Sequence, residues 1–493
     1  MEKCISESDI WCNPLSLENY PLGFFSPSRL KKKNPSRTAF QGPVRDFREM
    51  ADPEVLYDEG KWYLFASCGE VFVSSDMIHW EYCRIQFENP EDVLGYAPTV
   101  TRNGDQYLLS SSFPFANGKT QILAAPTPLG PYRSLGTPVD GEGRELAPPW
   151  LDPMLFTDED GRLYAYWGFG GEGKGIYGIE LERENPVQGI GKAVKLYDFS
   201  PDLVFERSGE NHEMSTCYYV EGESMFRYNG EYYLQYCAGG TQYRSYCVGV
   251  LRGRSPLGPF SAQPFPAAEQ KNGRVCGTGH GCWCRGTDGK VWQFYTCLIR
   301  RVHLYERRIG MDPVQFDLSG NARVEISQVP CSLRYGDLGL LALSVNKNAV
   351  ASSCAGSCYA HFAVDDCTHT WWMPGSGDHA PFLEVDLGEL FQIHSFMIQW
   401  AEEPCGSGGD LPFVPEAARY RVEFFAGKED LEKNNAVAVA DFMDNERDLL
   451  TDFRIFAFSG SARYVRLAFL PCANGSFCRG VNLFTVFGFR SRV

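Results

Sequence analysis

Five short stretches of this chain share one pattern, a turn glycine followed by an aromatic-rich strand. The stretches YDEGKWYLFAS, TRNGDQYLLSS, DEDGRLYAYWG, RYNGEYYLQYC and GTDGKVWQFYT turn at Gly60, Gly104, Gly161, Gly230 and Gly289. Each glycine follows Asn, Asp or Glu and can adopt the positive φ that a tight hairpin requires. Spacings of 44, 57, 69 and 59 residues leave room for about four strands per unit. The repeat predicts an all-β domain of five radial sheets, a five-bladed β-propeller.

Length, composition and charge limit the number of domains, the partners and the cellular location that we expect. The 493 residues are enough for two or three domains, and the formal net charge of -16 disfavours nucleic acid and anionic membranes as partners. The first residues lack the basic start and apolar run of an export signal, and no stretch is apolar enough to span a membrane. The 18 cysteines are scattered and are expected to stay reduced. We therefore expect a cytoplasmic protein, with no prediction for its oligomeric state.

Titratable residues recur just before these hairpins. Counting back from the turn glycine, Asp152, Glu221 and His280 lie nine residues away, Asp52 lies eight and Ala97 lies seven. In a propeller the first strand of each blade lines the central channel, so equivalent strand starts meet around one axis. The sequence therefore predicts three carboxylates and an imidazole at one mouth of the channel.

Converging carboxylates indicate glycoside hydrolysis. One acid must be protonated to donate to the leaving oxygen, and another must be ionised to activate water. A further anion nearby raises the pKa of the acid, and aromatic side chains offer flat faces to sugar rings.

Three segments also resemble a known family. ADPEVLYDEGKWYLFAS, LDPMLFTDEDGRLYAYWG and VEGESMFRYNGEYYLQYCAGG are similar to the signature segments of glycoside hydrolase family 43, in the family's order. That family consists of five-bladed propeller enzymes that act mainly on arabinose- and xylose-containing glycans. The resemblance covers roughly residues 40–325.

The resemblance implies a role for each carboxylate. Asp52 would be the general base, Asp152 the modulator of the acid's pKa and Glu221 the general acid. The family inverts the anomeric centre, which implies that base and acid lie about 6.5–9.5 Å apart. Where the family usually has Pro after Glu-Gly, this chain has Glu223, which strand alternation would put on the same side as Glu221. Glu223 is therefore a rival acid, and Glu213 in NHEMS is a weaker one.

Other resemblances concern the rim of the site. His280 in GTGHGCW matches the family's last-blade segment, where a histidine can help to hold a calcium ion through water, although calcium prefers oxygen ligands. The alternative is that His280 hydrogen-bonds within the site. Arg307 and Arg308 in YERRIGMDP are candidate substrate-binding residues, or else surface arginines. No cofactor is expected to be needed for the chemistry.

The repeat stops near residue 340. The sequences FLEVDLG and ARYVRL alternate as strands with one buried face, and they resemble a discoidin (coagulation factor 5/8 type C) β-sandwich, a jelly roll shared with family 32 carbohydrate-binding modules. Such a module could bind sugar or only support the propeller. We therefore predict an irregular segment at 1–40, a catalytic propeller at 41–325, and a linker with a discoidin-like sandwich at 326–493.

The resulting prediction is an inverting exo-glycosidase that releases arabinofuranosyl or xylosyl units from oligosaccharides. The alternatives are a furanosidase or galactan-directed hydrolase of the same fold, or a glycan-binding propeller without activity. The sequence leaves the sugar undetermined, because variable loops shape the pocket.

Overall fold

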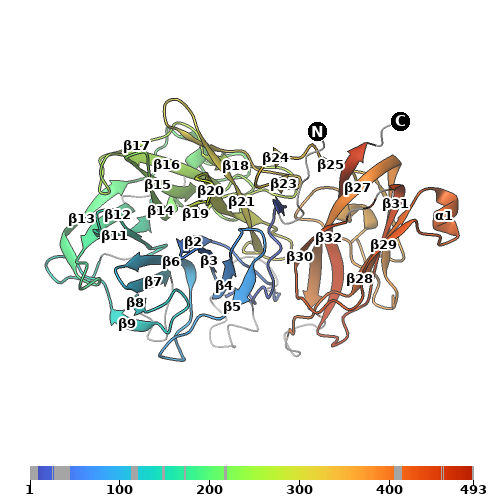
Figure 1. The fold of residues 1–493 in the computed structure, drawn as a ribbon, viewed down its shortest axis with the longest axis horizontal. Helices are drawn as coiled ribbons and strands as arrows, with labels where there is room; N and C mark the ends of the chain where they lie inside the picture. Colours follow the sequence, from blue (N-terminus) through green and yellow to red (C-terminus); the bar gives the residue numbers. More distant parts are fainter. Residues whose placement is uncertain are drawn as a thin grey trace. The chain divides into compact units, whose positions relative to one another are not determined.

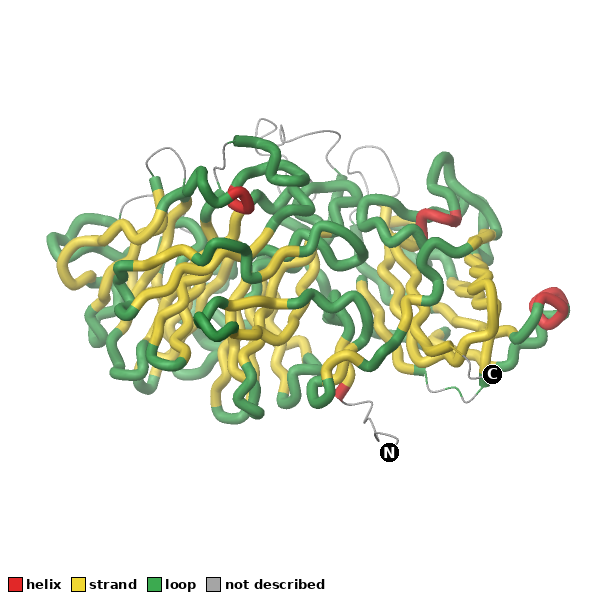
Figure 2. The backbone as a smooth tube through the Cα atoms, turned by 90° about the horizontal axis from the view of Figure 1, so that it is seen from above, coloured by secondary structure: helices red, strands yellow, loops and turns green. Residues whose placement is uncertain are grey.

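The protein folds into two compact units. The structure, a computed structural model, describes residues 9–24, 26, 45–112, 120–146, 150–170, 174–215, 219–404, 413–456, 458 and 460–490. The repeat unit comprises Glu49–Leu298 and Arg307–Ile326, and the C-terminal unit comprises Met1–Arg48, Ile299–Glu306 and Ser327–Val493. Strands and loops make up nearly all of the described chain (Figure 2), which confirms the all-β class. Much of the predicted irregular segment 1–40 lies outside the described residues.

The described part of the repeat unit contains five antiparallel sheets, here numbered sheets 1 to 5 in chain order (Figure 1). Four strands in each sheet follow one another in both sequence and space, and β18 adds to β16 in sheet 4. Sheet 1 has β2 (Glu54–Asp58), β3 (Lys61–Ala66), β4 (Glu70–Ser74) and β5 (Glu81–Cys83). Sheet 2 has β6 (Tyr96–Asn103), β7 (Gln106–Ser112), β8 (Ile122–Ala125) and β9 (Arg133–Gly136). Sheet 3 has β10 (Met154–Thr157), β11 (Leu163–Phe169), β12 (Gly175–Leu181) and β13 (Gly189–Tyr197). Sheet 4 has β14 (Glu221–Tyr228), β15 (Glu231–Ala238), β16 (Cys247–Gly253), β17 (Phe260–Ala262) and β18 (Ala268–Glu269). Sheet 5 has β19 (Gly281–Arg285), β20 (Val291–Leu298), β21 (Arg307–Phe316) and β22 (Ala322–Val324).

The predicted hairpin glycines lie in the turn just before the second strand of each sheet. Gly60, Gly104, Gly161, Gly230 and Gly289 have φ of 83°, 66°, 82°, 79° and 80°. A residue with a Cβ rarely adopts this conformation, so the glycines set where each first strand turns back. This part of the sequence prediction is confirmed.

Neighbouring sheets pack face to face around their first strands. The first strands of consecutive sheets contact each other, and β19 of sheet 5 returns to β2 of sheet 1. Apolar clusters fill the spaces between consecutive sheets, as where Leu109 and Val100 of sheet 2 meet Phe65 of sheet 1. Similar clusters join sheets 2 and 3, 3 and 4, and 4 and 5. Burial of these faces is the main stabilising contribution, because one sheet alone exposes two apolar faces.

The C-terminal unit is built on one large sheet. Its strand order is β25-β32-β27-β31-β28-β29, with β26 and β30 also paired to β27. A smaller sheet has the order β1-β23-β24, so a strand near the N-terminus belongs to this unit. The strands are β1 (Ile10–Trp11), β23 (Cys331–Ser332), β24 (Gly336–Asp337), β25 (Leu341–Ala342), β26 (Asn348–Ala351), β27 (Phe382–Pro404), β28 (Tyr420–Phe425), β29 (Ala438–Phe442), β30 (Thr451–Ile455), β31 (Ser461–Phe469) and β32 (Phe477–Arg490).

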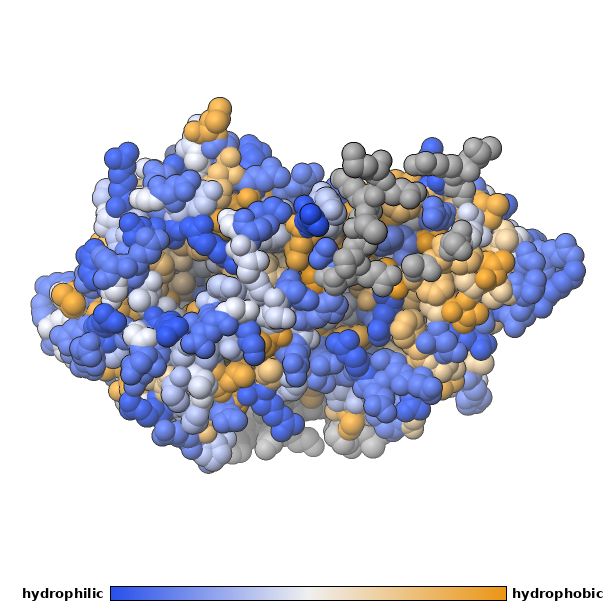
Figure 3. All heavy atoms as spheres, viewed as in Figure 1, coloured by the Kyte–Doolittle hydropathy of each residue, from blue (hydrophilic) through white to orange (hydrophobic). Residues whose placement is uncertain are grey.

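Among the residues that the structure describes, helix is confined to short segments. They include the 3-10 turns Val204–Glu206 and Ala360–Ala363 and the helix α1 (Lys428–Glu432). Within the described ranges, none of these is long or apolar enough to cross a membrane. Hydrophilic residues cover much of the face seen in Figure 3, in keeping with the acidic composition.

Candidate active site

One unusual backbone position recurs at the start of every first strand. Asp52, Ala97, Asp152, Gly222 and His280 have φ of 50°, 45°, 47°, 70° and 35°. A non-glycine residue with positive φ is uncommon and costs on the order of 1–3 kcal/mol, and such residues cluster at functional sites. The five sheets therefore present one equivalent, left-handed residue each.

Hydroxyl groups hold three of these residues to the preceding sheet. The Ala97 amide donates to Ser67 Oγ at 2.9 Å, and the Asp152 amide donates to Ser112 Oγ at 2.5 Å. The Asp52 amide donates to Thr296 Oγ1 at 2.9 Å, which ties sheet 5 to sheet 1. Each of these hydroxyl residues lies at or near the end of a second strand, as Ser67, Ser112 and Thr296 show. The repeat therefore includes the hydroxyl that accepts the hydrogen bond as well as the left-handed residue that donates it.

The left-handed residue of sheet 4 is Gly222, so Glu221 precedes the position that Asp52 and Asp152 occupy. Counting back from the turn glycine placed Glu221 in the same register as Asp152. That count is off by one here because the lengths of the turns and strands differ between sheets. Glu221 instead matches Tyr96, since each pairs with the second strand just before a register shift.

The register shift also separates Glu221 from Glu223. Glu221 pairs with Cys237 and Ser224 pairs with Gln235, so one extra residue is inserted between them. Cys237 and Gln235 share a face, which puts Glu221 and Ser224 on one side and Glu223 on the other. The expectation that alternation would put Glu221 and Glu223 on the same side is therefore wrong, because it assumed a regular strand.

Asp52 is a buried carboxylate surrounded by donors. Ser67 Oγ donates to its Oδ2 at 2.5 Å, and Arg307 Nη1 donates to its Oδ1 at 3.0 Å. His280 Nδ1 lies 3.4 Å from the same Oδ1. Burial by itself would raise the pKa of Asp52, but Arg307 and His280 outweigh it and hold that pKa below its ordinary value. Asp52 is thus ionised at neutral pH.

Asp152 lies near the same ring nitrogen of His280 as Asp52 does. His280 Nδ1 is 3.7 Å from Asp152 Oδ2, and Ser112 Oγ donates to Asp152 Oδ1 at 2.8 Å. Burial raises the pKa of Asp152, His280 opposes that rise and the charge of Asp52 adds to it. The imidazole Nδ1 therefore lies near one carboxylate oxygen of each aspartate, and a hydrogen-bonding role for His280 stays a prediction.

Glu221 has the opposite electrostatic surroundings. Burial raises the pKa of Glu221 well above its ordinary value, the nearby charges of Asp152 and Asp52 raise it further, and Arg307 opposes this rise without cancelling it. In the described ranges no hydrogen-bond donor stabilises its ionised form. Such surroundings favour the protonated form of a carboxyl group, which is the form that can donate a proton.

The two rival acids differ from each other, and Glu223 shares the raised pKa of Glu221. Both carboxyl oxygens of Glu223 are buried without a hydrogen-bond partner among the described residues, and burial followed by Asp152 raises its pKa well above the ordinary value. Glu213 lies in an exposed turn where backbone amides, that of Asn211 first, lower its pKa. Glu213 is consequently a poor proton donor.

Gly222 makes room for the imidazole. A Cβ at this position would lie 2.9 Å from His280 Cγ and Nδ1, and 2.9 Å from Cys237 Sγ. Such distances are shorter than real side chains tolerate, and φ is also positive here. Glycine is therefore required for His280 to reach both aspartates.

The two candidate substrate-binding arginines have different positions. Arg307 is buried and donates to both Glu49 and Asp52, so it belongs to the carboxylate cluster. Arg308 is the next residue of β21 and points to the other face by strand alternation, where its Nη1 donates to the Arg307 carbonyl. Direct contact of either arginine with substrate stays a prediction.

Some members of the cluster escaped the sequence reasoning. They are Glu49, Tyr96 and the hydroxyl residues Ser67, Ser112 and Thr296. Ser and Thr at the end of second strands gave a weak signal, since Ser67, Ser112 and Thr296 recur near the end of the quoted repeats. No signal in the sequence indicated Glu49, because the residues that bind its carboxylate are distant from it along the chain.

Calcium held through water by His280 stays a prediction, and the side chains near His280 test only direct coordination. The nearest carboxylates, Asp52 and Asp152, already accept hydrogen bonds from Ser67, Arg307 and Ser112. Across the part of the chain that the structure describes, no group of three or more His, Cys, Asp and Glu is arranged to hold a metal ion. The side chains present do not fit direct calcium coordination, and no step below involves it.

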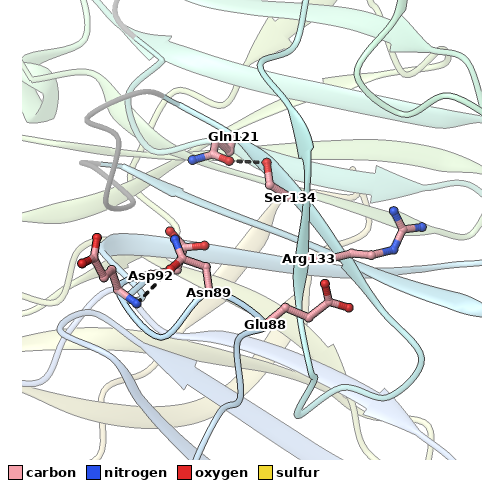
Figure 4. A pocket seen from close by; sticks show the side chains of 7 residues that line it. Glu88, Asn89, Asp92, Gln121, Arg133 and Ser134 are labelled. Atoms are coloured by element: carbon pink, nitrogen blue, oxygen red, sulfur yellow. Dashed lines mark hydrogen bonds between the residues drawn. The ribbon is translucent and has the colours of Figure 1, made fainter.

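A cavity of about 590 Å³ lies elsewhere, between the segment 88–92 that precedes sheet 2 and the outer strands of that sheet. Figure 4 shows its lining, in which Ser134 bonds to Gln121. The lining residues are Glu88, Asn89, Glu91, Asp92, Gln121, Arg133 and Ser134. None of them is aromatic, so this cavity lacks the flat face on which a sugar ring could stack.

Comparison with known proteins adds family information. The sequence profile of glycosyl hydrolases family 43 matches residues 40–321. An arabinoxylan arabinofuranohydrolase from Bacillus subtilis is 27% identical over 274 residues, which cover 44% of this chain and 50% of that protein. A β-D-galactofuranosidase from Aspergillus niger is 30% identical over 154 residues, 31% of this chain and 38% of that protein.

A solved structure of a thermostable family-43 glycoside hydrolase aligns with a TM-score of 0.47 and 21% identity, over 57% of this chain and 93% of that one. The chain spans half or less of the length of these two curated relatives. The profile match, in contrast, covers more than half of the chain and includes the whole carboxylate cluster. This chain belongs to glycosyl hydrolases family 43.

Proposed function

We propose that this protein is an inverting exo-glycosidase that cleaves arabinose- or xylose-containing oligosaccharides. Asp52 acts as general base, Glu221 as general acid and Asp152 as the modulator of the acid. The observation that carries the proposal is the split in ionisation: the pKa of Asp52 is lowered, whereas that of Glu221 is raised well above its ordinary value. Two carboxyl groups with opposite protonation at one pH are what single-displacement glycoside hydrolysis requires.

Each carboxyl group has one task in the reaction. The ionised Asp52 takes a proton from the attacking water, while Glu221 gives its proton to the leaving oxygen. The charge of Asp152 keeps that proton on Glu221 until the bond breaks, because it is among the charges that raise its pKa. His280 and Arg307 hold Asp52 in the ionised form.

The finer fold assignments belong to the same proposal. Five sheets with touching first strands, the last returning to the first, support a five-bladed β-propeller as the catalytic domain at 41–325. The large sheet of the C-terminal unit supports a discoidin-like β-sandwich within 326–493. Whether that module binds a sugar is tested by calorimetric titration of the whole protein with galactose and with xylose.

The names of the relatives support the choice of sugar. They include an arabinoxylan arabinofuranohydrolase from Bacillus subtilis and a putative β-xylosidase from Escherichia coli. An oligosaccharide is thus the proposed partner, and a cytoplasmic location is proposed with it. Buried free thiols such as Cys237 and Cys297 are compatible with a reducing compartment.

The test is a panel of aryl glycosides with α-L-arabinofuranosyl, β-D-xylosyl, galactofuranosyl and galactopyranosyl groups. We expect turnover of the first or second, and proton NMR of the first product should show the inverted anomer. Turnover of the galactofuranoside alone would favour the alternative, a furanosidase of the same fold. Retention of configuration would contradict the assigned roles, and inactivity on the panel and on arabinoxylan fragments would favour a glycan-binding protein.

A further inference from the structure

Glu49 is a buried carboxylate to which the proposed mechanism gives no role. It is 0% exposed and precedes Asp52 by three residues. Its Oε2 accepts hydrogen bonds from Arg307 Nε at 3.3 Å and Nη2 at 3.1 Å. Its Oε1 accepts from the Tyr96 hydroxyl and from the Cys68 thiol, the latter at 3.4 Å. A buried carboxylate with this many donors is fixed in one orientation.

The same guanidinium reaches the base. Arg307 uses its Nε and Nη2 edge on Glu49 and turns Nη1 to Asp52 Oδ1 at 3.0 Å. A guanidinium is planar and rigid, so fixing one edge determines where the remaining nitrogen points. Glu49 thereby decides the direction of the hydrogen bond that Asp52 receives.

Tyr96 anchors this arrangement from sheet 2. Its hydroxyl donates to Glu49, and its ring lies under the Arg307 guanidinium, 5.5 Å from ring centroid to Cζ. Tyr96 occupies in β6 the place that Glu221 occupies in β14, directly before the left-handed residue. In sheet 4 this position holds Glu221, the proposed acid, and in sheet 2 it holds Tyr96, whose ring packs against Arg307.

From these contacts we infer that Glu49 is a positioning residue, which locks the Arg307 guanidinium onto Asp52 and so keeps the base ionised and aimed at the attacking water. The inference builds on the proposed role of Asp52. Without the Glu49 carboxylate, Arg307 would lose the two hydrogen bonds from its Nε and Nη2 to that group, and the guanidinium could rotate away from Asp52. The base would then be misplaced and easier to protonate.

The test is Glu49→Gln, which keeps the shape of the side chain and removes its charge. We expect kcat to fall on the order of 10- to 100-fold with KM little changed, because a misplaced base mainly affects the chemical step. The acid limb of the kcat/KM profile should move to higher pH. Glu49→Asp keeps the charge and should recover part of the loss.

Glu206→Gln is the matched control. Glu206 is 0% exposed and accepts from the hydroxyls of Tyr197 and Tyr236, as Glu49 accepts from a tyrosine, but it has no arginine leading to Asp52. This variant should lower the melting temperature and leave the acid limb in place. If Glu49→Gln behaved in the same way, Glu49 would be merely structural and the inference would fail.

Two further results separate the possibilities. If Arg307 kept its place after Glu49→Gln, loss of a negative charge would move the acid limb to lower pH, and that shift would overturn the inference. A crystal structure of the variant gives a readout that needs no activity, and it should show Arg307 Nη1 beyond hydrogen-bonding distance of Asp52. Should the wild type hydrolyse nothing while Arg307 turns in the variant, the proposed function fails and the positioning role stands.

Discussion

Asp52 and Glu221 are carboxyl groups at the starts of two equivalent strands, yet their surroundings are opposite. Asp52 has a left-handed backbone and accepts hydrogen bonds from Ser67 and Arg307. Glu221 lies one position earlier in its sheet, beside two other carboxylates and without such donors among the described residues. Donors stabilise the ionised form, and their absence together with burial favours the protonated form. One repeated scaffold thus gives two carboxyl groups different pKa shifts, as the proposed base and acid require, through a different backbone position and different neighbours.

The largest expected effect comes from removing the base. Asp52→Ala should lower kcat/KM by about 10³-fold or more on every substrate of the panel, because the attacking water always needs a proton acceptor. Measuring kcat/KM with good and poor leaving groups checks this. If Asp52→Ala kept activity within tenfold of the wild type, Asp52 would not be the general base, and its contrast with Glu221 would have no catalytic meaning.

Removal of the acid should give a selective loss. Glu221→Ala is expected to lose about 10²- to 10³-fold on natural oligosaccharides and far less on aryl glycosides with very acidic leaving groups, which scarcely need protonation. The wild-type kcat/KM should fall at low pH as Asp52 is protonated and at high pH as Glu221 ionises, and the variant should lose the high-pH limb.

Glu223→Gln is the control for the acid. Glu223 is also buried with a raised pKa, but it faces the other side of the strand. Equal losses of Glu221→Ala on both kinds of leaving group, together with a leaving-group dependence in Glu223→Gln, would transfer the role of acid to Glu223.

A smaller effect is expected from filling the space beneath His280. Gly222→Ala should destabilise the fold by about 1–3 kcal/mol and lower activity by about tenfold, because the new Cβ would collide with His280 and Cys237. Gly230→Ala is the matched control, since Gly230 also has positive φ but no atom within 4 Å of the added Cβ. Thermal unfolding and kcat of both variants separate backbone strain from the collision. Full activity in Gly222→Ala would mean that His280 need not lie where it does.

The smallest expected effect tests a single donor to the base. Ser67→Ala removes the hydroxyl that donates to Asp52 and accepts from the Ala97 amide. Loss of that donor raises the pKa of Asp52, so the acid limb of kcat/KM should move to higher pH, with only a few-fold loss at the optimum. Ser110→Ala, which removes a buried hydroxyl that bonds to the Gln121 carbonyl, should leave the limb unchanged. A shift of the same size in both would show that the hydroxyl of Ser67 does not act on Asp52.

Local patterns in the sequence predicted much of the fold. Each of these patterns lies within about a dozen residues of sequence. They are the turn glycines, the aromatic strands that follow them and the acidic residues at the strand starts. Hairpin geometry depends on which residues tolerate positive φ, so the printed sequence is sufficient to locate the five hairpins. The same reasoning brought Asp52, Asp152, Glu221 and His280 to one region, although it misjudged the register of Glu221.

By itself, then, the sequence determined the class of the fold, the number of hairpin units and the residue types available for acid and base chemistry. Only the tertiary structure decided which carboxyl has a lowered pKa, that a register shift separates Glu221 from Glu223, and that Glu49 reaches Asp52 through Arg307. Arg307 is 255 residues from Asp52 along the chain, so no local pattern reports their contact. A pKa depends on burial and on neighbouring charges, and both of these are set when distant segments pack together.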